Sequence, residues 1–85
     1  MPIISEFYGI IIYMYVDHLP PHLHIKYENS YYRFNLKTGE FMDLPEKKTL
    51  KKLMKKWYNE HKEELLNSWE AMQTRHEIVQ VKPLD

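Results

Sequence analysis

Three of the five histidines lie close together, in the segment Asp17-His18-Leu19-Pro20-Pro21-His22-Leu23-His24. Imidazole donates and accepts protons near neutral pH and is the commonest protein metal ligand. On a strand, the last two histidines would point to the same face, because side-chain direction repeats every two residues. The double proline could fold the start of the segment back toward them. The candidate catalytic residues are therefore Asp17, His18, His22 and His24.

This histidine segment is compatible with three kinds of role. It could transfer protons to and from a substrate such as RNA, with His22 or His24 as base and the other as acid. It could bind zinc or another first-row metal through Asp17, His18, His22 and His24. It could also be purely structural, with the rings bonded to loop backbone or packed under a helix. Since no other cofactor motif is present, we expect no cofactor, with a divalent metal as the open alternative.

A second group of residues that could do chemistry is cationic. Six lysines fall between Lys47 and Lys56, and their spacing places them in two rows on one side of a helix. Lys51 and Lys55, together with Arg33, are the candidate nucleic-acid-binding residues, because they could hold phosphate charge. The acids lie further along the helix, the reverse of what the helix dipole prefers. Two explanations are a phosphate-binding face and antiparallel pairing with a second copy, and a solvated surface is the third.

The composition limits the kinds of protein that these residues could belong to. The chain has 85 residues, so it forms one domain, and its 12 basic and 12 acidic residues sum to zero charge. A polycation that coats nucleic acid by net charge is thus excluded. The lack of cysteine excludes disulfides, thiolate zinc sites and thiol nucleophiles. The apolar stretch 10–16 is too short for a membrane span, and no signal peptide is evident, so we expect a cytoplasmic protein without membrane contact.

Two unlike halves must position the candidate residues. Residues 1–44 contain β-branched and aromatic runs at 9–16, 22–27, 31–36 and 41–43, separated by turn residues, which predict an antiparallel meander. Residues 45–75 predict one long helix, and 76–85 a tail with strand-like alternation at 76–81. The fold class is therefore α+β, with a sheet of three to five strands. Aromatic and basic residues interleave on 27–34, so one set could face out and stack bases.

The helix is the element that must cover the sheet. Its apolar residues recur at spacings of three and four from Leu50 to Met72. Asp43 is expected near the N-cap and Pro45 in the first turn. An unbroken helix would be about 40 Å long, which exceeds the ~30 Å breadth of a small domain. We therefore expect either a bend near Asn59-Glu60 or a second chain that covers the far end.

Several motifs together resemble one known family. They are Met1-Pro2-Ile3-Ile4-Ser5 with Phe7-Tyr8-Gly9-Ile10, the Asp17–His24 histidine segment, Thr38-Gly39-Glu40, and Trp57, His61, Glu64-Leu65 and Trp69. The chain is similar over nearly its whole length to the small bacterial domain of unknown function numbered four-one-six-zero. Members are often encoded beside another small protein, which suggests a type II toxin–antitoxin pair. The resemblance implies no catalytic residue.

The resemblance, the small size and the histidine segment together lead to two functional hypotheses. The first is a toxin–antitoxin-type protein, with the toxin side favoured, RNA as target and a small neighbouring-gene antitoxin as partner. The second is a non-enzymatic interaction module that forms a homodimer or binds the neighbouring-gene protein. In the second, the histidines only shape their loop.

Overall fold

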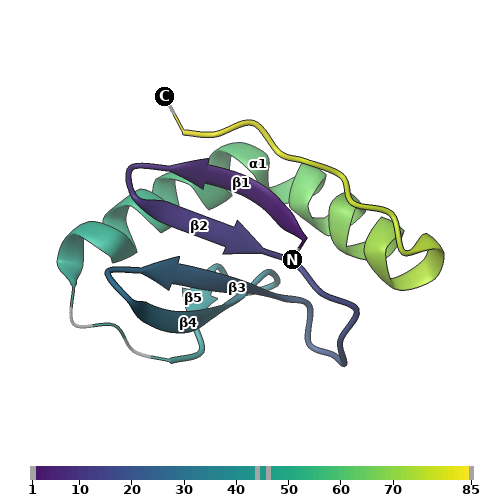
Figure 1. Cartoon of the computed structure of the whole chain (residues 1–85), viewed down its shortest axis with the longest axis horizontal. Helices are drawn as coiled ribbons and strands as arrows, with labels where there is room; N and C mark the ends of the chain where they lie inside the picture. Colours follow the sequence, from purple (N-terminus) through teal and green to yellow (C-terminus); the bar gives the residue numbers. More distant parts are fainter. Residues whose placement is uncertain (1, 44, 46, 85) are drawn as a thin grey trace.

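An antiparallel sheet with one long helix packed against it makes up the computed structural model, which describes residues 2–43, 45 and 47–84 (Figure 1). The strands follow one another in space as they do in sequence, in the order β1-β2-β3-β4-β5. Their bounds are β1 Ile3–Phe7, β2 Ile10–Tyr13, β3 His22–Tyr27, β4 Ser30–Asn35 and β5 Glu40–Phe41, and helix α1 spans Lys48–Arg75. The predicted α+β meander is confirmed.

Tight turns set the register of the meander. The β1–β2 turn has Tyr8 and Gly9 at positive φ, and the β3–β4 turn has Glu28 and Asn29 there. Two successive positive φ values are those of the two-residue hairpin turn whose twist matches the strands. Gly39, in the turn before β5, has φ +72°, and a Cβ there would lie 2.5 Å from the Tyr58 ring. Glycine is thus required at this position both by backbone conformation and by space.

Strand β1 is one that the sequence patterning did not predict. The pairing between β1 and β2 shifts register between Ile3 and Ser5, so Ile4 and Ser5 are both buried. This irregularity breaks the period-two alternation by which strands are recognised. The C-terminal segment, in contrast, forms no strand over residues 76–84. It runs extended beside β1, where the Val81 N–H donates to the Ile4 carbonyl at 2.9 Å.

The hydrophobic core lies between α1 and one face of the sheet. The helix contributes its predicted apolar stripe, and the C-terminal segment closes the side next to β1 (Figure 1). The buried residues at this interface include Ile10, Ile12, Leu23, Ile25, Phe34, Leu50, Met54, Trp57, Leu65, Trp69, Val81 and Leu84. Within the described residues, no helix has the length and apolarity of a membrane span.

Helix α1 bends and begins later than the sequence suggested. His61 has non-helical angles (φ −127°, ψ 20°), so the first of the two expected alternatives, a bend, occurs one to two residues beyond Asn59-Glu60. The N-cap position is Lys47 without a side-chain cap, and Pro45 precedes the helix. The prediction of Asp43 near the N-cap was wrong, because Asp43 instead binds Arg33 through two hydrogen bonds to the guanidinium, at 3.1 and 3.0 Å.

Candidate functional site

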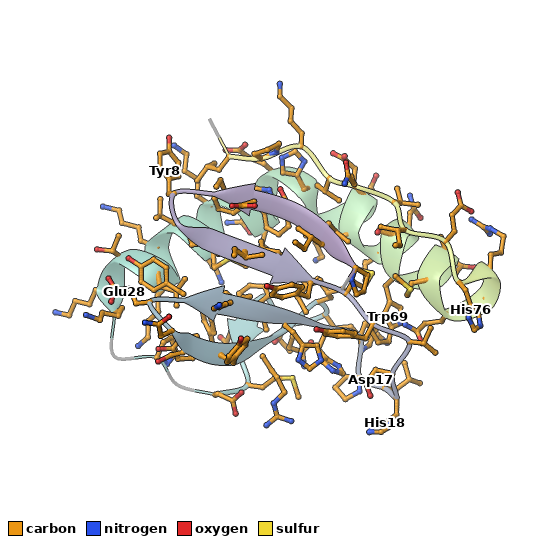
Figure 2. All side chains as sticks on the ribbon, in the orientation of Figure 1. Tyr8, Asp17, His18, Glu28, Trp69 and His76 are labelled. Carbon is orange, nitrogen blue, oxygen red and sulfur yellow. The ribbon has the colours of Figure 1, made fainter. Side chains whose placement is uncertain are left out.

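The loop between β2 and β3 carries Asp17 against the C-terminal part of α1. Gln73 of the helix holds this loop at two points. Its side-chain oxygen accepts the Asp17 backbone N–H at 2.9 Å, and its side-chain amide donates to the Tyr15 carbonyl at 2.8 Å. Asp17 and His18 therefore lie at the same end of the molecule as Trp69, away from the turns that hold Tyr8 and Glu28 (Figure 2).

The Asp17 carboxylate lies between two imidazole rings. Its Oδ2 atom is 3.1 Å from Nε2 of His22 and 3.5 Å from Nε2 of His24. One ligand atom from each of these three side chains lies within 4.8 Å of the other two. The ring of His18 lies 3.5 Å from the other carboxylate oxygen but is 95% exposed. The structure thus brings together three of the four candidate residues, Asp17, His22 and His24, which we call the Asp–His cluster.

Asp17 is held as an anion. The pKa of its carboxyl lies below the ordinary value of 3.8, chiefly because the carboxylate accepts the backbone N–H of His18, with further contributions from His24 and His22. An ionised carboxylate only accepts hydrogen bonds. Each imidazole nitrogen that faces it must therefore present a proton or share a cation with it.

The tautomer of His22 follows from its contact with Pro20. Its Nδ1 lies 2.8 Å from the Pro20 carbonyl, which can only accept, so Nδ1 carries a proton. In a neutral ring, Nε2 then presents a lone pair toward Asp17, 3.1 Å away. Two lone pairs at this distance repel each other. A cation bound between the two atoms would remove this repulsion.

Burial distinguishes the members of the Asp–His cluster. The side chain of His22 is 7% exposed and its ring packs on that of Trp69, with centroids 5.6 Å apart. His24 is 31% exposed, and its ring meets the Tyr15 ring edge-on at 4.8 Å. Asp17 is 25% exposed. A molecule that approaches from solvent therefore reaches His24 and Asp17, while His22 supports them from below.

The three candidate phosphate-holding residues are not gathered at this cluster. Arg33 lies opposite His24 on the neighbouring strand, but both of its guanidinium bonds go to Asp43. Lys51 and Lys55 lie in the first half of α1, 18 to 22 residues before Gln73. At 1.5 Å per residue, they are about 30 Å along the helix from the residue that holds Asp17. They line a hollow of about 260 Å³ with Phe34, Gly39, Glu40 and Phe41.

A comparison with known proteins gives a match that includes the Asp–His cluster. Residues 9–70 match the family model described as Domain of unknown function (DUF4160). The chain belongs to this family. No curated protein is matched, and no solved structure is matched. The matched DUF4160 region contains β2 to β5, the histidine segment and most of α1, while Met1–Tyr8 and the residues after Glu70 lie outside it.

Three residues of this DUF4160 chain support the Asp–His cluster without having been predicted from the sequence. They are Gln73, which holds the loop, and Tyr15 and Trp69, whose rings meet those of His24 and His22. Trp69 was assigned to the apolar stripe of the helix, and Tyr15 to a strand. Gln73 carries no sequence signal for this role, because its partners are 56 and 58 residues away.

The open face of the sheet in this DUF4160 chain extends from the Asp–His cluster along β3 and β4. Cross-strand pairing sets His24 opposite Arg33 and Lys26 opposite Tyr31, so these four side chains share the face that α1 does not cover. Tyr31 is 63% exposed, and the Lys26 ammonium lies 5.8 Å from its ring centre. Of the interleaved aromatics, Tyr27, Tyr32 and Phe34 instead belong to the core side.

The Arg33–Asp43 pair on this face predicts a pH-dependent stability. The pKa of Asp43 lies below its ordinary value of 3.8, chiefly because the Arg33 side chain donates to it. Its contribution is therefore present above that value and is lost as the pH falls through the lowered pKa. We expect Asp43→Asn to lower the urea midpoint of this DUF4160 chain slightly at pH 7, and the gap to the wild type to narrow as the pH falls below the ordinary carboxyl pKa of 3.8. A gap that is independent of pH would contradict this.

Proposed function

We propose that this protein is the toxin component of a bacterial toxin–antitoxin pair, that it acts in the cytoplasm, and that its target is single-stranded RNA. The observation that carries the proposal is the Asp–His cluster at the end of an open sheet face. The cluster supplies groups for proton transfer. The open face of β3 and β4 presents an exposed aromatic ring and cations, the groups on which proteins bind single-stranded RNA.

The cluster suits cleavage of an RNA phosphodiester bond. The ribose 2′-hydroxyl must lose its proton as its oxygen attacks phosphorus, and the leaving 5′-oxygen must gain one. His24, about one-third exposed beside the Asp17 anion, is the group that faces such a hydroxyl. With only protons in the cluster, His24 is the base, Asp17 stabilises the imidazolium that forms, and a solvent water gives the leaving 5′-oxygen its proton. A cation held by Asp17, His22 and His24 would instead supply a water of lowered pKa to act as base. Both forms require Asp17 and His24.

The β3–β4 face supports binding of the RNA strand on either side of the cleaved bond. Tyr31 offers a ring on which a base can stack, and Lys26 beside it offers charge for phosphate. Arg33 lies opposite His24 and could bind the phosphate under attack. To do so, its guanidinium would have to leave Asp43, to which it donates in this structure. Lys51 and Lys55 could contact only a distant part of a long RNA.

The toxin assignment is tested by expression in bacterial cells. We expect induction of the protein alone to arrest growth, and co-expression of the neighbouring gene to restore it. Growth that is unaffected by the wild-type protein, at an expression level confirmed by immunoblot, would overturn the toxin assignment. Purified protein should shorten a fluorescent single-stranded RNA, with the products separated on a gel.

The proposed RNA-binding face on β3 and β4 makes a separate prediction about binding. We expect Tyr31→Ala to weaken the affinity for a single-stranded RNA oligonucleotide by about 5- to 150-fold, because base stacking on an aromatic ring contributes roughly 1–3 kcal/mol. Lys26→Gln should reduce the salt dependence of binding by about one phosphate contact. Tyr8→Ala is the matched control, since Tyr8 is 59% exposed but lies in the β1–β2 turn. Equal losses of RNA affinity in Tyr31→Ala and Tyr8→Ala would contradict RNA binding at the β3–β4 face.

A non-enzymatic interaction module is the second candidate, favoured by apolar exposure in the loop before β3. Val16 and Leu19 are 52% and 75% exposed beside the Asp–His cluster. A small antitoxin could cover them, or a second copy could pair along α1, whose lysines precede its glutamates. Co-purification of the neighbouring-gene product with no growth arrest and no RNA cleavage would favour this module over the toxin.

A further inference from the structure

We infer that Asp17, His22 and His24 form a binding site for one first-row divalent metal ion, with Zn²⁺ as the ion that fits best. This site goes beyond the proposed action on RNA, since metal binding is a property of the protein alone. Its argument has three parts, which concern the spacing of the three ligand atoms, the tautomer of His22 and the access to the site.

Each imidazole nitrogen lies from the carboxylate oxygen at the spacing of two ligands of one metal ion, and all three atoms lie within 4.8 Å of one another. Zinc bonds to imidazole nitrogen and carboxylate oxygen are about 2.0–2.2 Å long, so two such ligands of a tetrahedral ion lie about 3.4 Å apart. Oδ2 of Asp17 lies 3.1 Å from Nε2 of His22 and 3.5 Å from Nε2 of His24. Both imidazoles approach the same oxygen with the same ring nitrogen. With a small shift of the rings, one ion would join all three atoms, whereas one proton joins only two.

The hydrogen bond on the far side of His22 prepares it as a ligand. Its Nδ1–H donates to the Pro20 carbonyl at 2.8 Å, so the Nε2 lone pair points into the cluster. Metal-bound histidines almost always donate their other ring N–H to a carbonyl or carboxylate in this way, which orients the ring. Gln73 orients Asp17 in a similar way, because its side-chain oxygen accepts the Asp17 backbone N–H. The donor set of two imidazoles and one carboxylate suits Zn²⁺ and other first-row ions better than Mg²⁺ or Ca²⁺.

Access to the cluster leaves room for a fourth ligand. His22 is nearly buried, but His24 and Asp17 are about a third and a quarter exposed. A metal with three protein ligands and one position open to solvent holds a water there and lowers its pKa. At this site, such a water would serve as the base in phosphodiester cleavage, so His24 would act as ligand and not as proton acceptor.

The test is metal binding by tag-free protein that has been stripped with a chelator and titrated calorimetrically with Zn²⁺ at pH 7.5. We expect one equivalent to bind with a micromolar or lower Kd and to raise Tm, because the ion binds the folded state. His24→Ala and Asp17→Asn should each weaken binding by about 100-fold or more. Both side chains are partly exposed, so these variants should fold, which circular dichroism checks. Co²⁺ substitution should give the intense visible absorption of a four-coordinate N/O site.

His61→Ala is the matched control for the titration. His61 also lies beside a carboxylate, with Nδ1 2.8 Å from Oε1 of Glu64, but no second imidazole joins that pair. The Zn²⁺ affinity of the His61→Ala variant should equal that of the wild type. Binding weaker than about 0.1 mM, or an affinity that His24→Ala and His61→Ala reduce equally, would overturn the site. The titration measures zinc binding in the absence of RNA, so its outcome is independent of the proposed function. Zinc binding without toxicity would support the metal site and contradict the toxin assignment. Toxicity without zinc binding would do the reverse.

Discussion

Replacing His24 by alanine is expected to abolish growth arrest and to lower the rate of RNA cleavage by about 10²–10⁴-fold, the usual contribution of a positioned acid–base group. His24 is the imidazole of the Asp–His cluster that solvent reaches, and its Nε2 lies 3.5 Å from the Asp17 anion. His24 is required whether it accepts the proton itself or binds a metal ion whose water would accept it. The cleavage rate is measured with a fluorescent RNA under single-turnover conditions.

Two further variants make the His24 result specific. Asp17→Asn keeps the size of the side chain and removes its charge, so its loss of rate should be comparable. His61→Ala removes an imidazole that is also paired with a carboxylate, at the bend of α1 and outside the Asp–His cluster. It should leave cleavage within about twofold of the wild type. Cleavage by His24→Ala that stays within tenfold of the wild type, in a protein with an unchanged circular dichroism spectrum, would remove the cluster from the mechanism.

Replacing Trp57 by alanine is expected to lower the free energy of unfolding by about 3–5 kcal/mol. Its side chain is completely buried, and its ring lies 5.2 Å from that of Phe7 on β1. Its Nε1–H also donates to the Lys82 carbonyl at 2.9 Å, which ties the C-terminal segment to the helix. A domain of this size has little stability to spare, so much of the protein should unfold. Urea denaturation followed by circular dichroism measures the change.

Trp57→Phe separates packing from the hydrogen bond. It retains an aromatic ring against Phe7 but has no donor for Lys82, so it should cost clearly less than Trp57→Ala. Hydrogen exchange at Val81, whose N–H bonds to the Ile4 carbonyl at 2.9 Å, should be faster in both variants. If Trp57→Ala proves no more costly than Trp57→Phe, then the ring is not a main support of the core.

Most of the fold could be predicted from the sequence because the signals for it are local. The runs at 22–27 and 31–36 became β3 and β4 within one residue of their predicted bounds, since turn residues delimit them. The apolar spacing identified the buried face of α1, and the length argument anticipated its bend. β1 was missed because its bulge disrupts alternation, and the segment 76–81 has alternation but forms no strand.

The histidine segment illustrates what the sequence determined by itself. Spacing alone placed His22 and His24 on one face of a strand, and proline chemistry suggested that Asp17 returns to them. These are properties of neighbouring residues, set by backbone geometry over a few bonds. The composition excluded cysteine chemistry and binding driven by net charge in the same way.

Only the tertiary structure decided which residues share the site. Gln73 holds Asp17 from the far end of the chain, His18 remains exposed, and Arg33 is engaged by Asp43. Lys51 and Lys55, which the sequence analysis proposed as phosphate-binding residues, lie far along the helix. The reason is that the direction of α1 across the sheet, which no local pattern specifies, determines which of its residues meets the β2–β3 loop.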